Sequence, residues 1–218
     1  MDTLNKEWDA CFNLALEAVQ AGSFGIGAVI INGLGETISR GRNQLYDSNT
    51  SCNIVKNSTV SHAELNAIAG IPEVHRDDKN LTLYATVEPC PMCMGAIAMS
   101  NIKKVIIASR DPWTGSTRLL DEDSYLNRKG ISVNFETGLV EELFFLLHLY
   151  YIRKKMKDKH INVEHPALQA FRSCYATYYY HSNVLFEDEE FIFALINGDK
   201  SQIIQKVQVL RLAKDDRT

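Results

Sequence analysis

Hydrophobic positions along the first part of the chain alternate between helical and strand periodicity. Apolar residues three and four apart predict a helix from Trp8 to Val19, ended by Gly22. The apolar run 26–31 and the segment 36–40 flank Asn-Gly-Leu-Gly, which predicts a β-hairpin. The pattern then predicts a helix over 62–69, a strand over 81–87, a helix over 91–100, strands over 104–108 and 131–135, and a long helix over 139–157. Such alternation is typical of an α/β layered fold with helices on both faces of one sheet.

The pattern changes after His160. Segments 166–181 and 199–214 are predicted to be helical, with the acidic and aromatic segment 186–191 between them. Eight of the chain's 20 aromatic residues fall within 161–218, so we expect their rings to be buried against the main domain or another chain. The sequence therefore predicts a main domain over 1–157 and a helical extension over 158–218.

Composition narrows the class of protein. With 45% hydrophobic and 23% charged residues, the chain is expected to be globular, and no apolar run is long enough to span a membrane. The first residues carry no secretory signal, and five cysteines without one indicate the cytoplasm, where close pairs are metal ligands or redox thiols. The net charge of −4 disfavours nucleic acid as a partner.

Two short motifs carry the candidate chemistry. They are His62-Ala63-Glu64 and Glu88-Pro89-Cys90-Pro91-Met92-Cys93. A Cys-x-x-Cys at the first turn of a helix points both sulfurs at one ion, and with His62 it gives three zinc ligands. Three protein ligands leave a position for water, which is the arrangement of catalytic zinc, and Glu64 lies close enough to exchange protons with that water. A structural zinc module and a redox Cys-x-x-Cys are the alternatives, but a redox pair leaves His62 and Glu64 unexplained.

The segment Thr86-Val87-Glu88-Pro89-Cys90-Pro91-Met92-Cys93-Met94-Gly95-Ala96-Ile97 resembles the cytidine deaminase-like superfamily, and in particular its tRNA adenosine deaminase and guanine deaminase branch. The resemblance covers about residues 5–157. It implies a three-layer α/β/α fold with a central mixed five-stranded sheet, and Zn²⁺ held by His62, Cys90 and Cys93. It also implies that Glu64 is the general acid/base of a hydrolytic deaminase, and that the chain forms a homodimer or higher homo-oligomer.

Further residues are expected to contact the substrate: Phe24, Asn43, Ala63, Glu88, Asp111 and Trp113. The resemblance implies that Asn43 contacts the base, and that the Ala63 amide and a carbonyl near Glu88 orient it. Asp111 and Trp113 follow a strand end, where ligands collect in α/β sheets. The alternatives are that Asn43 belongs to a loop-entry turn, that Trp113 packs in the core after a proline turn, and that Phe24 is a core residue.

Three departures from the family pattern leave the substrate open. Gly25 stands where the family often has proline, the loop over 43–62 is long, and 161–218 has no counterpart. We expect a free base, a nucleoside or a related small heterocycle. The alternative is a tRNA-specific adenosine deaminase that makes inosine in the anticodon, in which the basic cluster 153–159 would hold the RNA. An alternative of another class is a non-catalytic zinc-binding module.

Overall fold

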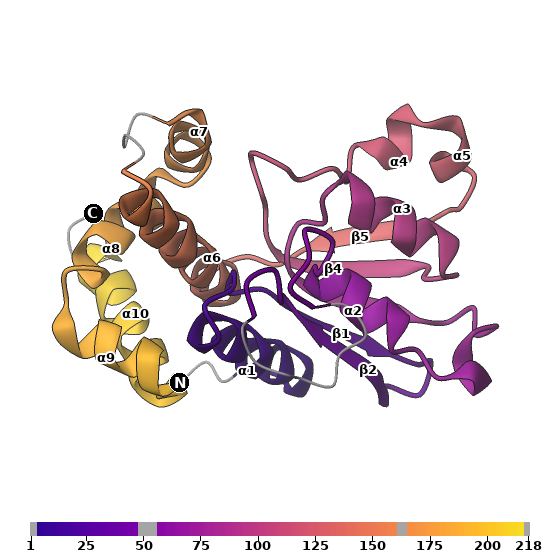
Figure 1. The fold of residues 1–218 in the computed structure, drawn as a ribbon, viewed down its shortest axis with the longest axis horizontal. Helices are drawn as coiled ribbons and strands as arrows, with labels where there is room; N and C mark the ends of the chain where they lie inside the picture. Colours follow the sequence, from indigo (N-terminus) through magenta and orange to yellow (C-terminus); the bar gives the residue numbers. More distant parts are fainter. Residues whose placement is uncertain (1–3, 48–55, 161–164, 216–218) are drawn as a thin grey trace.

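A five-stranded mixed sheet forms the centre of the structure, a computed structural model that describes residues 4–47, 56–160 and 165–215 (Figure 1). The strands are β1 (Gly27–Ile31), β2 (Thr37–Arg42), β3 (Thr82–Val87), β4 (Lys104–Ser109) and β5 (Ser132–Phe135). They are ordered β2-β1-β3-β4-β5, with β2, β1 and β3 antiparallel and β3, β4 and β5 parallel. The expected α/β class and five-stranded mixed sheet are confirmed.

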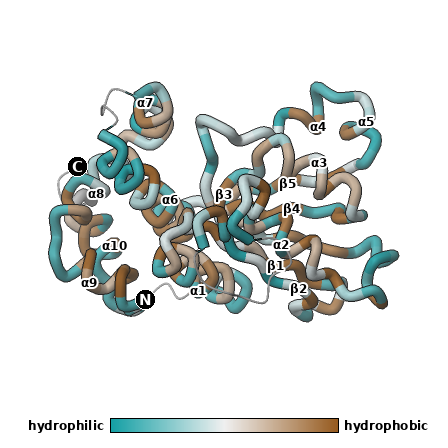
Figure 2. The backbone as a smooth tube through the Cα atoms, in the orientation of Figure 1, coloured by the Kyte–Doolittle hydropathy of each residue, from teal (hydrophilic) through white to brown (hydrophobic). Residues whose placement is uncertain are grey.

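Helices cover both faces of this sheet (Figure 1). The first part of the chain contributes α1 (Lys6–Gln20), α2 (Ala63–Ala69), α3 (Pro91–Met99), the short α4 (Leu119–Glu122) and α5 (Ser124–Asn127), and α6 (Leu139–Asp158). Strand alternation sends Val29 into the hydrophobic cluster with α1 and α6, and Ile30 into the cluster with α2 and α3. Hydrophobic residues are concentrated in these strands and helices, and the connecting segments are mostly hydrophilic (Figure 2).

One edge of the sheet gathers the segments that carry the motifs. The parallel strands β3 and β4 end side by side, with Val87 paired to Ser109. Cys90 follows the first of these strands, and Asp111 follows the second. Because the carboxyl ends of parallel strands meet at one edge, both residues are placed beside the same crevice, where α/β proteins bind ligands.

The last part of the chain consists of four helices. They are α7 (Pro166–Cys174), α8 (Ala176–Leu185), α9 (Glu189–Asn197) and α10 (Lys200–Asp215). One hydrophobic cluster joins them to α1 and α6, and it includes Phe145, Phe171, Leu195 and Val207. Many of the extension's aromatic rings are therefore buried against the main domain, and α6 packs against both parts. The division between residues 157 and 158 stays a prediction.

Two details of the extension differ from the sequence prediction. The helix expected over 166–181 is broken at Tyr175, whose backbone is non-helical with φ −128° and ψ 53°. The segment expected to separate two helices leads into α9, because Asp188 caps this helix by accepting hydrogen bonds from the backbone N–H groups of Glu190 and Phe191. The helix ends at Gly198, which has the left-handed conformation that glycine adopts without strain. None of the described helices is both long and apolar enough to cross a lipid bilayer.

Candidate metal centre and substrate pocket

Three side chains with metal-binding atoms converge at the starts of two helices. His62 immediately precedes α2, Cys90 immediately precedes α3, and Cys93 lies in the first turn of α3. The Nδ1 atom of His62 is 3.6 Å from Cys90 Sγ and 3.5 Å from Cys93 Sγ, and the two sulfurs are 3.6 Å apart. Pro91 fits the first turn of α3, where a backbone N–H has no helical partner.

This donor set fits Zn²⁺. Tetrahedral zinc with Zn–S bonds of about 2.3 Å and a Zn–N bond of about 2.0 Å needs donor atoms about 3.5–3.8 Å apart. The three measured separations agree with this spacing. Among the residues that the structure describes, this is the group of histidine, cysteine and acidic side chains close enough to hold a metal ion. Three ligands leave one coordination position for water or substrate, as expected for a catalytic site.

Electrostatics at the two thiols favour a bound cation. The hydrogen bond with Cys93 and a second with His62 lower the pKa of the Cys90 thiol to about 4, against the opposing effect of burial. The same hydrogen bond with Cys90, together with burial, raises the pKa of Cys93. A lowered pKa of the Cys90 thiol favours the thiolate, which is the form that zinc binds.

Glu64 lies in the first turn of α2, beside the metal ligands, and its side chain is almost completely buried. Burial is the main reason that the pKa of its carboxyl is raised, and the nearby positive charge of His62 opposes this effect. Glu64 borders a cavity of about 370 Å³ that also reaches His62 and Cys90. A carboxyl with this placement can take up and release protons next to a metal-bound ligand.

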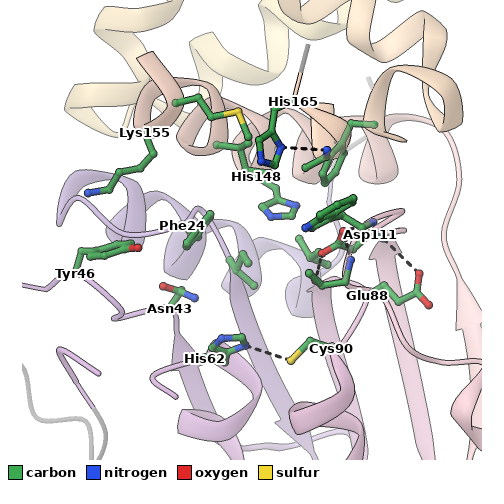
Figure 3. Close-up of a pocket in the computed structure, with 18 of the residues that line it drawn as sticks. Phe24, Asn43, Tyr46, His62, Glu88, Cys90, Asp111, His148, Lys155 and His165 are labelled. Carbon is green, nitrogen blue, oxygen red and sulfur yellow. Dashed lines mark hydrogen bonds between the residues drawn. The ribbon is translucent and has the colours of Figure 1, made fainter. Parts of the chain in front are cut away.

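Most of the residues expected to contact a substrate line this cavity. Phe24, Asn43, Glu88, Asp111 and Trp113 border it, and Figure 3 shows several of them around the opening above His62. Ala63 differs, because its side chain is packed in the hydrophobic cluster beneath α2 and does not border the cavity. The proposed contact through its backbone amide stays a prediction.

Asn43 is held in place by a buried ion pair. Arg42 donates two hydrogen bonds to the carboxylate of Asp47, at 2.9 and 2.7 Å, and a third to the backbone carbonyl of Asn43 at 3.2 Å. The Oδ1 atom of Asn43 accepts from the backbone N–H of Leu45 at 3.2 Å. This leaves the amide nitrogen on the side of the cavity, as Figure 3 shows. Both the turn interpretation and the pocket interpretation of Asn43 are therefore compatible with its position.

The carboxylates of Glu88 and Asp111 are engaged in building the loop over 111–117. Glu88 accepts from the backbone N–H and hydroxyl of Thr117, at 3.2 and 2.6 Å. Asp111 accepts from the backbone N–H groups of Trp113 and Thr114, at 2.9 and 3.0 Å. These bonds hold Trp113 at the mouth of the cavity, where its side chain is 54% exposed. The alternative that Trp113 packs in the core is therefore wrong.

Sequence reasoning missed the wall of the cavity formed by α6, by α7 and by His165, the residue before α7. This wall includes Ile152 and Lys155 on α6 and Phe171 on α7. It also includes His148. This histidine is the single polar residue within the apolar run 143–149, and its presence there was the one sign in the sequence that this helix contributes to a site. Figure 3 shows His148, Lys155 and His165 on the side of the cavity opposite His62.

The basic cluster 153–159 divides between two roles. Lys155 and Lys159 border the cavity, and the Lys155 ammonium lies 4.1 Å from the centre of the Tyr46 ring. Arg153 points toward α8, where it hydrogen-bonds to Ser182 and Asn183 at 3.2 and 2.9 Å. Part of the cluster therefore attaches the extension to α6, and part lies at the mouth of the cavity.

Comparison with known proteins identifies the family. The family model of the cytidine and deoxycytidylate deaminase zinc-binding region matches residues 1–109. The chain is 30% identical over 157 residues to a tRNA-specific adenosine deaminase of Bacillus subtilis, and the alignment covers 68% of this chain and 90% of that protein. It is 32% identical over 120 residues to a tRNA(Ile)-lysidine synthase of Deinococcus radiodurans, and this alignment covers 53% of this chain but only 19% of that longer protein.

A solved structure from a study of A-to-I editing by tRNA:A34 deaminases at the wobble position has a similar fold. Its TM-score is 0.50 at 23% identity, and the match covers 60% of this chain and 96% of that one. The superfamily indicated by the two motifs is confirmed, and its zinc-binding region contains His62, Cys90 and Cys93. The chain therefore belongs to the cytidine and deoxycytidylate deaminase family and is a zinc-dependent hydrolytic deaminase.

Proposed function

We propose that this deaminase acts on a nucleobase presented as a small molecule, either a free base, a nucleoside or a related heterocycle, and releases ammonia. The observation that carries this proposal is the wall of α6 and α7 on the side of the cavity opposite His62. A cavity of about 370 Å³ is large enough for a base or a nucleoside. Ala167 and Phe171 of α7 line the cavity, so a substrate has to fit beside this helix.

Glu64 moves the protons in this proposal. His62, Cys90 and Cys93 would hold the zinc ion, which would supply a Lewis acid that lowers the pKa of water at the site. The buried Glu64 carboxylate accepts a proton from the attacking water and passes it to a ring nitrogen of the base. Glu64 then transfers the second proton to the departing amine, so that ammonia leaves and the ring carbon keeps the oxygen.

Asn43 and Phe24 orient the base in this proposal. The amide nitrogen of Asn43 can donate a hydrogen bond to an acceptor on the ring, because the Oδ1 atom is already bonded to the Leu45 N–H. Phe24 packs against Tyr46 and Tyr151, with ring centres 6.3 and 4.6 Å away, and so offers an aromatic wall for a flat heterocycle.

Adenosine in tRNA is the second candidate substrate. It is favoured by the relatives named as tRNA-specific adenosine deaminases, one of which aligns over 90% of its length. Lys155 and Lys159 at the mouth of the cavity could contact phosphates, and the exposed Trp113 could stack with a base. This candidate requires the anticodon base to enter beside α7.

Ammonia release from a panel of substrates distinguishes these candidates. The zinc-loaded full chain is incubated with adenine, guanine, cytosine, their nucleosides and nucleotides, and tRNA. Release from a base or nucleoside supports the proposal, whereas release from tRNA alone supports the second candidate and contradicts the first. Glu64→Gln is the control, because it should keep zinc and lose ammonia release. A Glu64→Gln variant with full activity would overturn the proposed role of this residue.

A further inference from the structure

We propose that His148 is a substrate-binding residue that selects the base by hydrogen-bonding to its ring edge. This inference rests on the proposed function, and it assigns part of the substrate recognition to a helix outside the matched family region. That region ends at residue 109, whereas His148 lies on α6 (Leu139–Asp158). Recognition at this position would therefore come from outside the zinc-binding region.

His148 is buried at the cavity without a hydrogen-bond partner. Its side chain borders the cavity, and the residue is only 6% exposed. No group among the described residues hydrogen-bonds to its Nδ1 atom. Nδ1 is itself enclosed by the protein, so a ligand would meet the part of the imidazole ring that borders the cavity. Buried polar atoms are nearly always paired in folded proteins, which makes a histidine with an unpaired nitrogen beside a cavity unusual for a residue that serves packing alone.

Another buried histidine in the same chain shows the usual situation. His181 on α8 is as deeply buried as His148, and its Nδ1 atom lies 2.5 Å from the carboxylate of Glu142. The imidazole of His181 is thus paired with a carboxylate inside the protein. His148 has no such partner in the described part of the chain, although burial makes the need for one equally strong.

Aromatic rings hold the His148 side chain in one orientation. The Phe24 ring centre lies 6.0 Å away and the Phe171 ring centre 5.4 Å away, both in edge-to-face geometry. Phe24 follows α1 and Phe171 belongs to α7, so the imidazole is fixed between the main domain and the extension. A group that is already ordered loses little conformational freedom when it binds a ligand.

Gly25 permits this close packing. A Cβ atom at position 25 would lie 2.7 Å from the carbonyl oxygen of Leu147, the residue before His148. The placement of His148 therefore depends on the close approach of α6 to residue 25, which a side chain larger than glycine would disturb.

The imidazole suits a neutral heterocycle better than an anion. Burial lowers the pKa of His148, and the negative charge of Asp111 opposes this only in part, so the ring is neutral near pH 7. A neutral imidazole has one donor and one acceptor nitrogen. The ring edges of purines and pyrimidines also present donors and acceptors, so either tautomer of His148 can pair with them.

Kinetics of His148 variants test this role. We compare zinc-loaded wild type, His148→Phe and His148→Asn on the best substrate of the panel, with His75→Phe as the same change at a histidine outside the cavity. We expect His148→Phe to raise KM about tenfold or more with a smaller effect on kcat, and His148→Asn to recover part of the loss. A KM for His148→Phe within about twofold of wild type, with unchanged zinc content, would overturn the proposal.

Direct binding separates this proposal from the proposed function. Imidazole ¹⁵N resonances are recorded on zinc-loaded Glu64→Gln protein titrated with adenine, cytosine and guanosine. Shifts of the His148 nitrogens on saturation support the proposal, even if the wild type deaminates none of the panel and the proposed function fails. If a base binds and the His148 nitrogens do not shift, or if none of the three binds, the proposal is wrong.

Discussion

The hydroxyl of Tyr175 accepts a hydrogen bond from the backbone N–H of Arg110, with 2.6 Å between oxygen and nitrogen. Tyr175 lies between α7 and α8, and Arg110 directly follows β4 and precedes Asp111. The same tyrosine ring packs against Phe145 on α6, with centres 4.7 Å apart. The extension is therefore attached to the strand end from which the pocket loop begins.

Loss of this hydroxyl should weaken the attachment. In Tyr175→Phe the Arg110 N–H loses its partner in a partly buried position, which we expect to cost about 0.5–1.5 kcal/mol of unfolding free energy. Because the loop over 111–117 starts at this point, KM should also increase. Urea denaturation and steady-state kinetics measure both effects, with exposed Tyr180→Phe as the control. Equal stability of Tyr175→Phe and wild type would contradict the structural role of the bond.

The same contact explains why part of the fold could not be predicted. The hydrophobic pattern over 166–181 is compatible with one helix, and the break at Tyr175 accompanies a bond to Arg110, 65 residues earlier in the sequence. Local periodicity carries no information about such a partner. In contrast, α9 had a local indication, because Asp188 and Gly198 are favourable residues for the start and end of a helix.

In the candidate site, too, some residues could be predicted from local sequence and others could not. The metal ligands could be predicted because two of them belong to one helical turn and the third accompanies Glu64 in a short motif. Asn43 and Trp113 were found through resemblance and position after a strand. His148 stands out locally as the one polar residue in the apolar run 143–149. The cavity that it borders is created by the packing of α1, α6 and α7, so the local sequence could not show what this residue faces.

Substitution of Gly25 should disturb the cavity through α6. In Gly25→Ala the new methyl group would lie 2.7 Å from the Leu147 carbonyl oxygen and 2.9 Å from Val19 Cγ2, so α6 must shift. Such overpacking costs about 1–3 kcal/mol, and displacement of His148 should raise KM. Gly95→Ala is the matched control, since a Cβ atom there meets nothing within 4 Å. A Gly25→Ala variant as stable as Gly95→Ala would show that the contact is not tight.

Removal of zinc should destabilise the protein. A ligand that binds only the folded state raises the free energy of unfolding, and the three donor atoms belong to two separate helix starts. We expect chelation to lower Tm and Cys93→Ala to lose bound zinc, as measured by calorimetry and elemental analysis. The exposed Cys174 provides the control, because Cys174→Ala should retain zinc. Full zinc content in Cys93→Ala would show that Cys93 is not a zinc ligand.

Acid should weaken the turn that carries Asn43. Burial alone would raise the pKa of Asp47, but hydrogen bonds from Arg42 and Gln44 outweigh it and hold the pKa below its usual value. The pair therefore contributes stability above the unfolded-state pKa, and this contribution is lost as pH falls toward the lower folded-state value. Urea denaturation between neutral and acid pH should show a smaller decrease in stability for Asp47→Asn than for wild type. If the stability of wild type and of Asp47→Asn fell equally with decreasing pH, Asp47 would not be the group whose protonation weakens this turn.

Glu142 should control how firmly the extension is held. Its fully buried carboxylate accepts hydrogen bonds from His181 on α8 at 2.5 Å and from Arg211 on α10 at 2.6 Å. Glu142→Ala leaves both partners without their acceptor, and loss of one member of a buried charged group typically costs about 3–5 kcal/mol. Glu142→Gln keeps one acceptor oxygen, so its free energy of unfolding should decrease less than that of Glu142→Ala.

Hydrogen exchange can localise this effect. In Glu142→Ala we expect faster amide exchange in α8 and α10 than in the strands β1 and β3, because only the helices lose a partner. Since α7 precedes α8 and borders the cavity, KM should increase while zinc content stays unchanged. Exchange that accelerates equally in the sheet would mean that Glu142 supports the whole fold, and the extension would then have no separate role in closing the pocket.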